Sequence, residues 1–157
     1  MTGMRDPVRM YRESAVRGTS PVGLIVILYE EIVRAIRKAQ RGLAQNNIEQ
    51  RTLQLSHAMM VVGHLQAILD FRAGGEVAQN LSRFYNTMRD KMLEANVQAS
   101  HETLEWLATT FSEHAAAWKE VDRAVANPSE DEPVGAGVTL GLHPTAVGDR
   151  RRVRAER

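Results

Sequence analysis

The chain has no cysteine, few aromatic residues and almost no net charge, and each of these scarcities excludes a class of protein. With 0 Cys in 157 residues, it can form no disulfide framework, no thiolate zinc site and no cysteine nucleophile. Its 20 Lys and Arg nearly balance 19 Asp and Glu, so the total charge favours neither nucleic acid nor an anionic membrane as a partner. The longest apolar run, residues 24–29, is far shorter than the ~20 residues of a membrane span.

The N-terminus also lacks the apolar stretch and small-residue cleavage site of a signal peptide. We therefore expect a cytoplasmic protein that binds neither membrane nor nucleic acid. Its length fits one domain, because domains run to roughly 100–200 residues. The chain is 43% hydrophobic but only 5% aromatic, so we expect a core of aliphatic side chains.

Proline is absent between Pro21 and Pro128, and a proline-free stretch of this length permits long helices. Within it, apolar residues recur at spacings of three and four in four separate stripes, which is the pattern of amphipathic helices. The third stripe, for example, consists of Val77, Leu81, Phe84, Met88, Met92 and Ala95. The periodicity predicts four helices and an all-α fold.

The breaks between the stripes have the residue types that begin and end helices. Ser20-Pro21 provides an N-cap hydroxyl followed by proline at the first helical position. Asn46-Asn47 separates the first helix from the second, Gly74-Gly75 is expected to end the second, Glu76 to open the third, and Ser100 to cap the fourth. Because the loops are short, we expect an antiparallel, up-down-up-down four-helix bundle over residues 20–125.

Two segments lie outside this predicted bundle. Residues 1–19 form an N-terminal cap segment, in which a short helix over residues 5–15 would place Val8 and Tyr11 on one side. Residues 126–157 are rich in proline and glycine, have no apolar period and end in an arginine cluster. We expect this tail to be disordered.

The histidines give no sign of catalysis or metal binding. None of the five follows a glutamate by three residues, which is the spacing of di-iron bundles. We therefore predict no enzymatic activity, no metal and no cofactor. The alternative is a histidine phosphotransfer bundle with His57 or His64 as the phosphoryl acceptor, although neither is followed by the lysine that such domains usually carry.

Apolar residues exceed what a bundle core needs, which is about three in seven. Residues 24–29 are apolar all round the first helix, Met60 and Ile68 add to the second, and Trp106 lies beside the main stripe of the fourth. Such surplus has to contact another segment, a second subunit or a partner. The simpler interpretation is a thick core with the N-terminal segment packed over one end.

An ordered set of motifs resembles the FliS family of flagellin export chaperones over about residues 8–123. The motifs are Thr19-Ser20-Pro21 with Leu28-Tyr29-Glu30, Leu69-Asp70-Phe71, Gly74-Gly75-Glu76-Val77-Ala78-Gln79-Asn80-Leu81, Phe84-Tyr85-Asn86-Thr87-Met88, Leu93-Glu94-Ala95-Asn96 and Ala117-Trp118. The chain departs from the family pattern at Gly23, where a polar residue is more usual, and at Glu31, where the family often has glycine. Asn86 and Ser100 also stand where aspartate is more frequent.

The resemblance implies a chaperone that binds the disordered C-terminal segment of flagellin, prevents its premature polymerisation and delivers it to the flagellar type III export gate. In some relatives an anti-sigma factor also binds. The bound segment would be partly helical and wrapped around the bundle, where a broad apolar surface offsets the entropy of ordering it. The sequence leaves monomer and homodimer both open.

By the same resemblance, Val8 and Tyr11 would form a cap over the binding groove that moves when flagellin arrives. Surplus apolar surface, unexplained amides and aromatic rings off the main stripes supply the other candidates. The residues that we expect to contact flagellin are Val8, Tyr11, Ile25, Tyr29, Asn80, Tyr85, Asn96 and Trp106. Local hydrogen bonding by the two Asn residues, and core packing by Tyr85 and Trp106, remain alternatives.

Overall fold

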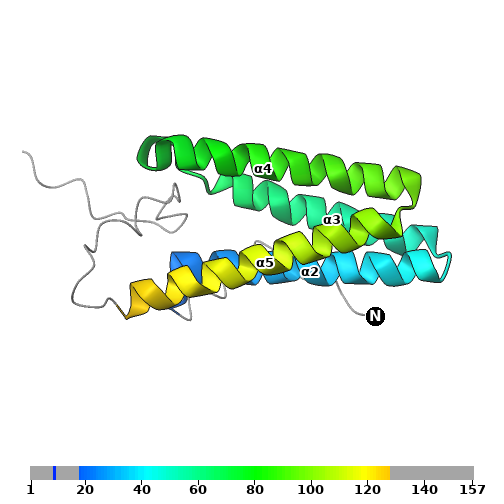
Figure 1. The fold of residues 1–157 in the computed structure, drawn as a ribbon, viewed down its shortest axis with the longest axis horizontal. Helices are drawn as coiled ribbons and strands as arrows, with labels where there is room; N and C mark the ends of the chain where they lie inside the picture. Colours follow the sequence, from blue (N-terminus) through cyan, green and yellow to red (C-terminus); the bar gives the residue numbers. More distant parts are fainter. Residues whose placement is uncertain (1–8, 10–17, 128–157) are drawn as a thin grey trace, which may run out of the picture.

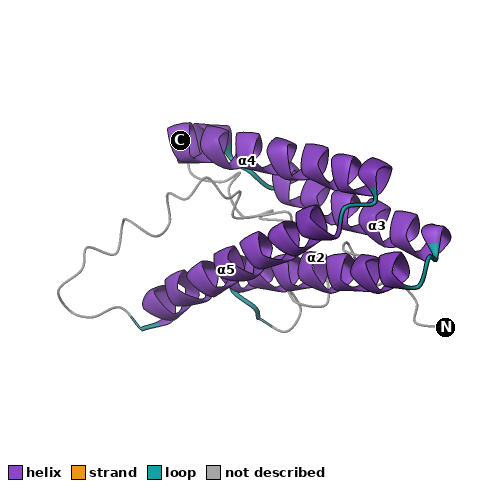
Figure 2. Ribbon diagram, turned by 45° about the vertical axis from the view of Figure 1, so that its right-hand side comes forward, coloured by secondary structure: helices purple, strands orange, loops and turns teal. Residues whose placement is uncertain are grey.

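The computed structural model describes Arg9 and residues 18–127. These residues form four helices and no strand: α2 (Pro21–Ala44), α3 (Ile48–Ala67), α4 (Phe71–Gln98) and α5 (His101–Ala126) (Figures 1 and 2). The predicted all-α four-helix bundle is confirmed. Apart from Arg9, the expected short helix over residues 5–15 lies outside the described residues, as does the tail from residue 128. None of the four helices combines the length and apolar character that crossing a membrane requires.

The predicted caps at Ser20 and Ser100 are also confirmed, and Asn47, which was predicted only to separate the first two helices, caps α3. Each of these side chains accepts a hydrogen bond from a backbone N–H in the first turn: Gly23 N at 2.9 Å, Gln50 N at 3.0 Å and Thr103 N at 3.1 Å, respectively. These bonds satisfy donors that have no partner within the helix.

The prediction that Gly74-Gly75 ends the second helix is wrong. Helix α3 ends at Ala67, and Asp70 caps α4 by accepting hydrogen bonds from Arg72 N at 2.9 Å and Ala73 N at 3.0 Å. Gly75 does adopt a positive φ of 50°, but it lies inside α4, where it interrupts the helical geometry. The Asp70 carboxylate starts a helix before the glycines, so their conformational freedom produces a kink.

Helices α2 and α5 are joined by exposed ion pairs at two levels. Lys119 Nζ lies 2.6 Å from Glu30 Oε1, and Arg37 Nη1 lies 2.5 Å from Glu105 Oε2. As the residue number rises along α2, that of its partner falls along α5, so the two helices run in opposite directions. Figure 1 shows the same reversal in the colours of the two ribbons.

Helices α3 and α4 are also antiparallel. Arg51, near the start of α3, donates to Asn96 Oδ1 near the end of α4, while Gln66, near the end of α3, donates to the Ser82 carbonyl. Helix α2 packs mainly against α3 on one side and α5 on the other. This position explains why its first turns are apolar nearly all round: every residue from Leu24 to Tyr29 except Ile27 is buried.

Candidate functional site

Aromatic side chains from α2, α4 and α5 meet at the centre of the bundle. The hydroxyl oxygens of Tyr29 and Tyr85 lie 2.9 Å apart and are buried. Tyr29 also makes edge-to-face contacts with Phe111 and Trp118, whose ring centroids lie 5.5 Å and 6.5 Å away. Burial is the main cause that raises the pKa of both tyrosines above the usual value of 10. Both phenols are therefore protonated at neutral pH, and one can donate a hydrogen bond to the other.

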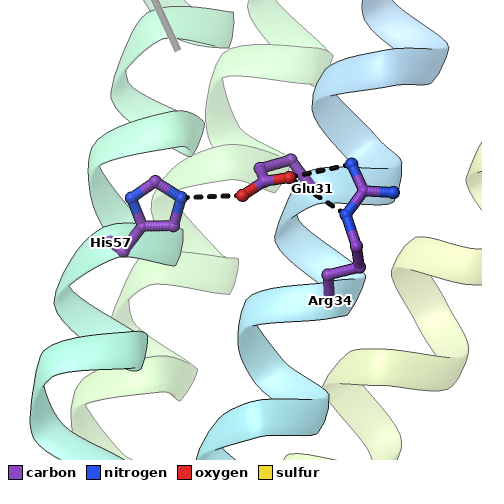
Figure 3. Close-up of polar contacts among 3 residues, drawn as sticks. All are labelled: Glu31, Arg34 and His57. Carbon is purple, nitrogen blue, oxygen red and sulfur yellow. Dashed lines mark hydrogen bonds and ion pairs between the residues drawn. The ribbon is translucent and has the colours of Figure 1, made fainter. Parts of the chain in front are cut away.

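A buried polar network links α2 to α3 (Figure 3). Glu31 Oε1 lies 3.1 Å from His57 Nε2, and Glu31 Oε2 accepts two hydrogen bonds from Arg34, from Nε at 3.0 Å and from Nη2 at 2.8 Å. The side chains of Glu31 and His57 are only 7% and 2% exposed, whereas Arg34 reaches solvent.

The ionisation of Glu31 reflects two opposing effects. Burial raises its pKa, but the hydrogen bonds from His57 and Arg34, together with the two positive charges that these residues can carry, lower it to about 2. The carboxylate is therefore charged at neutral pH, and His57 Nε2 is the donor in their hydrogen bond. The geometry gives a structural role to Glu31, which the sequence had marked only as a departure from the family pattern.

The same network bears on the phosphotransfer alternative. One ring nitrogen of His57 is bonded to Glu31 and the other, Nδ1, is buried. Neither nitrogen is accessible to a phosphodonor. His64, the other candidate, is half-buried in α3. Among the described residues, no three His, Cys, Asp or Glu side chains converge so as to hold a metal ion.

The structure separates the six predicted contact residues that it describes into three groups. Ile25, Tyr29 and Tyr85 are buried, with exposed fractions of 2% or less. Asn96 is half-buried, where it accepts hydrogen bonds from Arg51 and Thr52 of α3.

The remaining candidates include two that are exposed. Trp106 is 46% exposed on α5, and Asn80 is exposed on α4, where its Oδ1 accepts a hydrogen bond from Arg83 at 3.1 Å. Val8 and Tyr11 lie outside the described residues. Trp106 and Asn80 are therefore the described candidates that a partner can reach without rearranging the bundle.

Helix α3 carries an exposed apolar face that the sequence indicated only in part. Leu53 and Met60 are 49% and 47% exposed, and they lie on one side of the helix with the small exposed residues Ser56 and Ala67. We call these four residues the outer face of α3. No Asp, Glu, Lys or Arg occurs between Arg51 and Asp70. The surplus at Met60 was the available signal, but Leu53 was missed because apolar residues occur all round this helix.

A second group of exposed apolar residues lies near the end of α4. Leu93 is 51% exposed and Val97 85% exposed. They flank Asn96, whose hydrogen bonds with Arg51 and Thr52 bring the end of α4 against the start of α3. Ile48, which is 66% exposed, begins α3 one turn before Thr52. Exposed apolar side chains are therefore found on both helices at this end of the bundle.

Comparison with known proteins decides the family. The family model for the flagellar protein FliS matches residues 4–125 of the chain. The chain belongs to the FliS family. The resemblance drawn from the motifs is confirmed, and the match includes all four helices up to the last turn of α5.

Several flagellar secretion chaperones are similar to this FliS-family chain. The flagellar secretion chaperone FliS of Salmonella typhimurium is 32% identical over 121 residues, which cover 76% of this chain and 90% of the relative. FliSB of Pseudomonas aeruginosa is 25% identical, with 75% and 94% covered, and FliS of Escherichia coli is 29% identical, with 69% and 80% covered. Membership in a family of flagellar secretion chaperones supports a chaperone role in flagellar export for this chain.

Proposed function

We propose that this FliS-family chain is a cytosolic export chaperone that binds the disordered C-terminal segment of flagellin, prevents its premature polymerisation and delivers it to the flagellar export gate. The observation that carries the proposal is the exposed, uncharged outer face of α3 in a member of a secretion chaperone family. Such a face favours an apolar segment as its partner, since no charged group on it would have to lose water when the segment binds.

Two properties of the surface suit a segment that folds on binding. Leu53 and Met60 are exposed apolar side chains two turns apart on one side of α3, beside small residues, and the unbranched Met side chain adapts to irregular partners. Leu93 and Val97 of α4, and Trp106 of α5, are further exposed apolar side chains on other helices of the bundle. A disordered segment that wraps the bundle can contact several such areas in turn, and this offsets the entropy lost on ordering.

The predicted contact residues that are buried, or that lie outside the described residues, are not part of the exposed surface that the structure describes. Ile25, Tyr29 and Tyr85 support the bundle from within, and a partner reaches them only if the helices part. Val8 and Tyr11 would cover the binding surface of the free protein and leave it when flagellin arrives. Replacing Tyr11 with Ala tests this cap: we expect a change in affinity or stability, and unchanged values of both would refute it.

The proposal is tested by titrating the full-length chain with a synthetic peptide of the last ~40–50 residues of flagellin from the same organism. We expect saturable binding at micromolar concentrations by calorimetry, with a negative heat-capacity change because apolar surface is buried. A peptide of the same composition in scrambled order is the control. Absence of saturable binding, or equal binding of the scrambled peptide, would contradict the proposal.

A further inference from the structure

The apolar pattern of α3 does not by itself select the face that the helix buries. Leu55, Val62 and Leu65 are fully or almost fully buried, yet Leu53 and Met60 on the opposite side are about half exposed. Rotating α3 about its axis would bury Leu53 and Met60 in place of some of these side chains, so hydrophobicity alone distinguishes the two faces weakly. Something other than hydrophobicity has to determine which side faces outward.

The hydrogen bond between Glu31 and His57 can determine which side of α3 faces outward. Among the described residues, it is the one side-chain to side-chain hydrogen bond that joins α2 to α3. Both groups are buried, so a displacement of α3 that separated them would leave a carboxylate without its partner in apolar surroundings. A polar pair of this kind penalises every arrangement except the one in which it forms.

Arg34 reduces the free-energy cost of burying the Glu31–His57 pair. Its guanidinium bonds the second oxygen of Glu31 and itself reaches solvent, so the carboxylate has a cationic partner without a second charge being buried. His57 Nε2 donates to the other oxygen of the same carboxylate. Its Nδ1 has no hydrogen-bond partner, so the ring has one polar partner, Glu31, and that partner lies on α2.

We infer that Glu31 and His57 are positioning residues that fix the rotation and register of α3 on α2, and so determine that Leu53 and Met60 face outward. Burying the pair costs desolvation free energy, but it favours one arrangement of α3 on α2 over the alternatives. This inference rests on the proposed function only where it says that the outer face of α3 receives the flagellin segment. The effect on the position of α3 is independent of any partner.

The test replaces the pair with leucines, Glu31→Leu together with His57→Leu, in the full-length chain. Because the chain has no cysteine, spin labels can be attached at Arg41→Cys on α2 and Ser56→Cys on α3, both exposed positions. We expect one narrow interspin distance with the native pair. In the leucine variant we expect a folded protein with a second distance, shifted by about 5 Å if α3 slides by one turn.

The double leucine variant also tests whether the position of α3 affects binding of the flagellin peptide. If only a fraction of molecules present the outer face of α3, the apparent dissociation constant for the flagellin peptide rises by the reciprocal of that fraction. Glu31→Gln, which keeps the acceptor for His57, should retain one distance and near-native affinity. Arg37→Ala with Glu105→Ala, which removes an exposed pair between α2 and α5, should also retain one distance.

A single, unshifted distance in the leucine variant would overturn the inference. If the leucine variant does not fold, Glu31→Leu alone supplies the test, because it removes the partner of His57 and should broaden the distance distribution. A broadened distribution in a protein whose native form binds no flagellin peptide would support the positioning role and refute the proposed function. Failure of the positioning role and failure of the proposed flagellin binding therefore give different results.

Discussion

The hydroxyl of Tyr29 on α2 lies 2.9 Å from that of Tyr85 on α4, and both side chains are buried. The two helices are separated in sequence by the whole of α3, so this hydrogen bond is a long-range contact across the centre of the bundle. Tyr29 also packs edge-to-face against Phe111 and Trp118, whereas the Tyr85 hydroxyl has its hydrogen-bond partner in Tyr29. Removing the Tyr29 hydroxyl therefore leaves the buried Tyr85 hydroxyl without this hydrogen-bond partner.

Replacing Tyr29 with Phe should lower the free energy of unfolding by about 1–3 kcal/mol, because the Tyr85 hydroxyl is left buried and unpaired. Adding Tyr85→Phe should recover part of this loss, since no unpaired hydroxyl then remains at that position. Urea denaturation of the two single variants and the double variant measures the coupling. Strictly additive effects would contradict the contact.

Acid should weaken the bundle through Glu31. Its pKa is about 2 in the folded chain against an ordinary value of 4.5, which applies in the unfolded chain, so the stabilisation is fully present above pH 4.5 and is lost as the pH falls toward 2. A shift of this size corresponds to about 3 kcal/mol. Comparing the unfolding free energy of the native chain and Glu31→Gln between pH 6 and about pH 3 isolates the effect. The difference between the two should shrink as the pH falls, and a constant difference would argue against it.

Gly42 should not tolerate alanine, although it lies within a helix. A Cβ there would approach the backbone N of Arg51 to 2.9 Å and the carbonyl oxygen of Asn47 to 3.1 Å, where α2 ends against the start of α3. We expect Gly42→Ala to lower the free energy of unfolding by about 1–3 kcal/mol because backbone has to shift. Gly63, in α3, is the matched control: a Cβ there meets nothing within 4 Å. Gly63→Ala should stabilise the helix by about 0.5–1 kcal/mol, and equal effects at the two sites would refute the steric explanation.

A charge on the outer face of α3 should impair flagellin binding without unfolding the chain. Met60→Asp places a carboxylate in the proposed apolar contact, and we expect at least a tenfold weaker affinity, or about 1.4 kcal/mol. Val125→Asp on α5 is the matched control, since both side chains are 47% exposed. Peptide titration and thermal unfolding of both variants separate affinity from stability. Equal losses of affinity would show that the outer face of α3 has no special part.

The local features of the fold were predictable from the sequence. Ser20, Asn47 and Ser100 cap their helices with their own side chains, and a cap requires only residues within one turn. The position of Gly74-Gly75 was interpreted wrongly because two signals compete there. Asp70 starts a helix four residues before Gly74, and a cap that forms hydrogen bonds outweighs the tendency of glycine to end one.

The candidate contact residues show where sequence reasoning stops. Surplus apolar residues at the start of α2 suggested that Ile25 and Tyr29 face a partner, but α2 lies between α3 and α5, which cover both sides of it. Asn96 proved to hold α3 against α4 through Arg51 and Thr52. Conversely, Leu53 gave no signal, since a helix that is apolar on several sides does not reveal which side will be exposed.

The sequence by itself determined the number of helices, most of their ends and the family, because periodicity, caps and motif order are properties of the chain alone. The tertiary structure decided which apolar residues are internal, that His57 pairs with Glu31 and that the outer face of α3 is exposed. The physical reason is that burial is a relation between helices. Whether a tyrosine, a glutamate or a leucine is buried or exposed depends on which residues, far apart in the chain, pack against it.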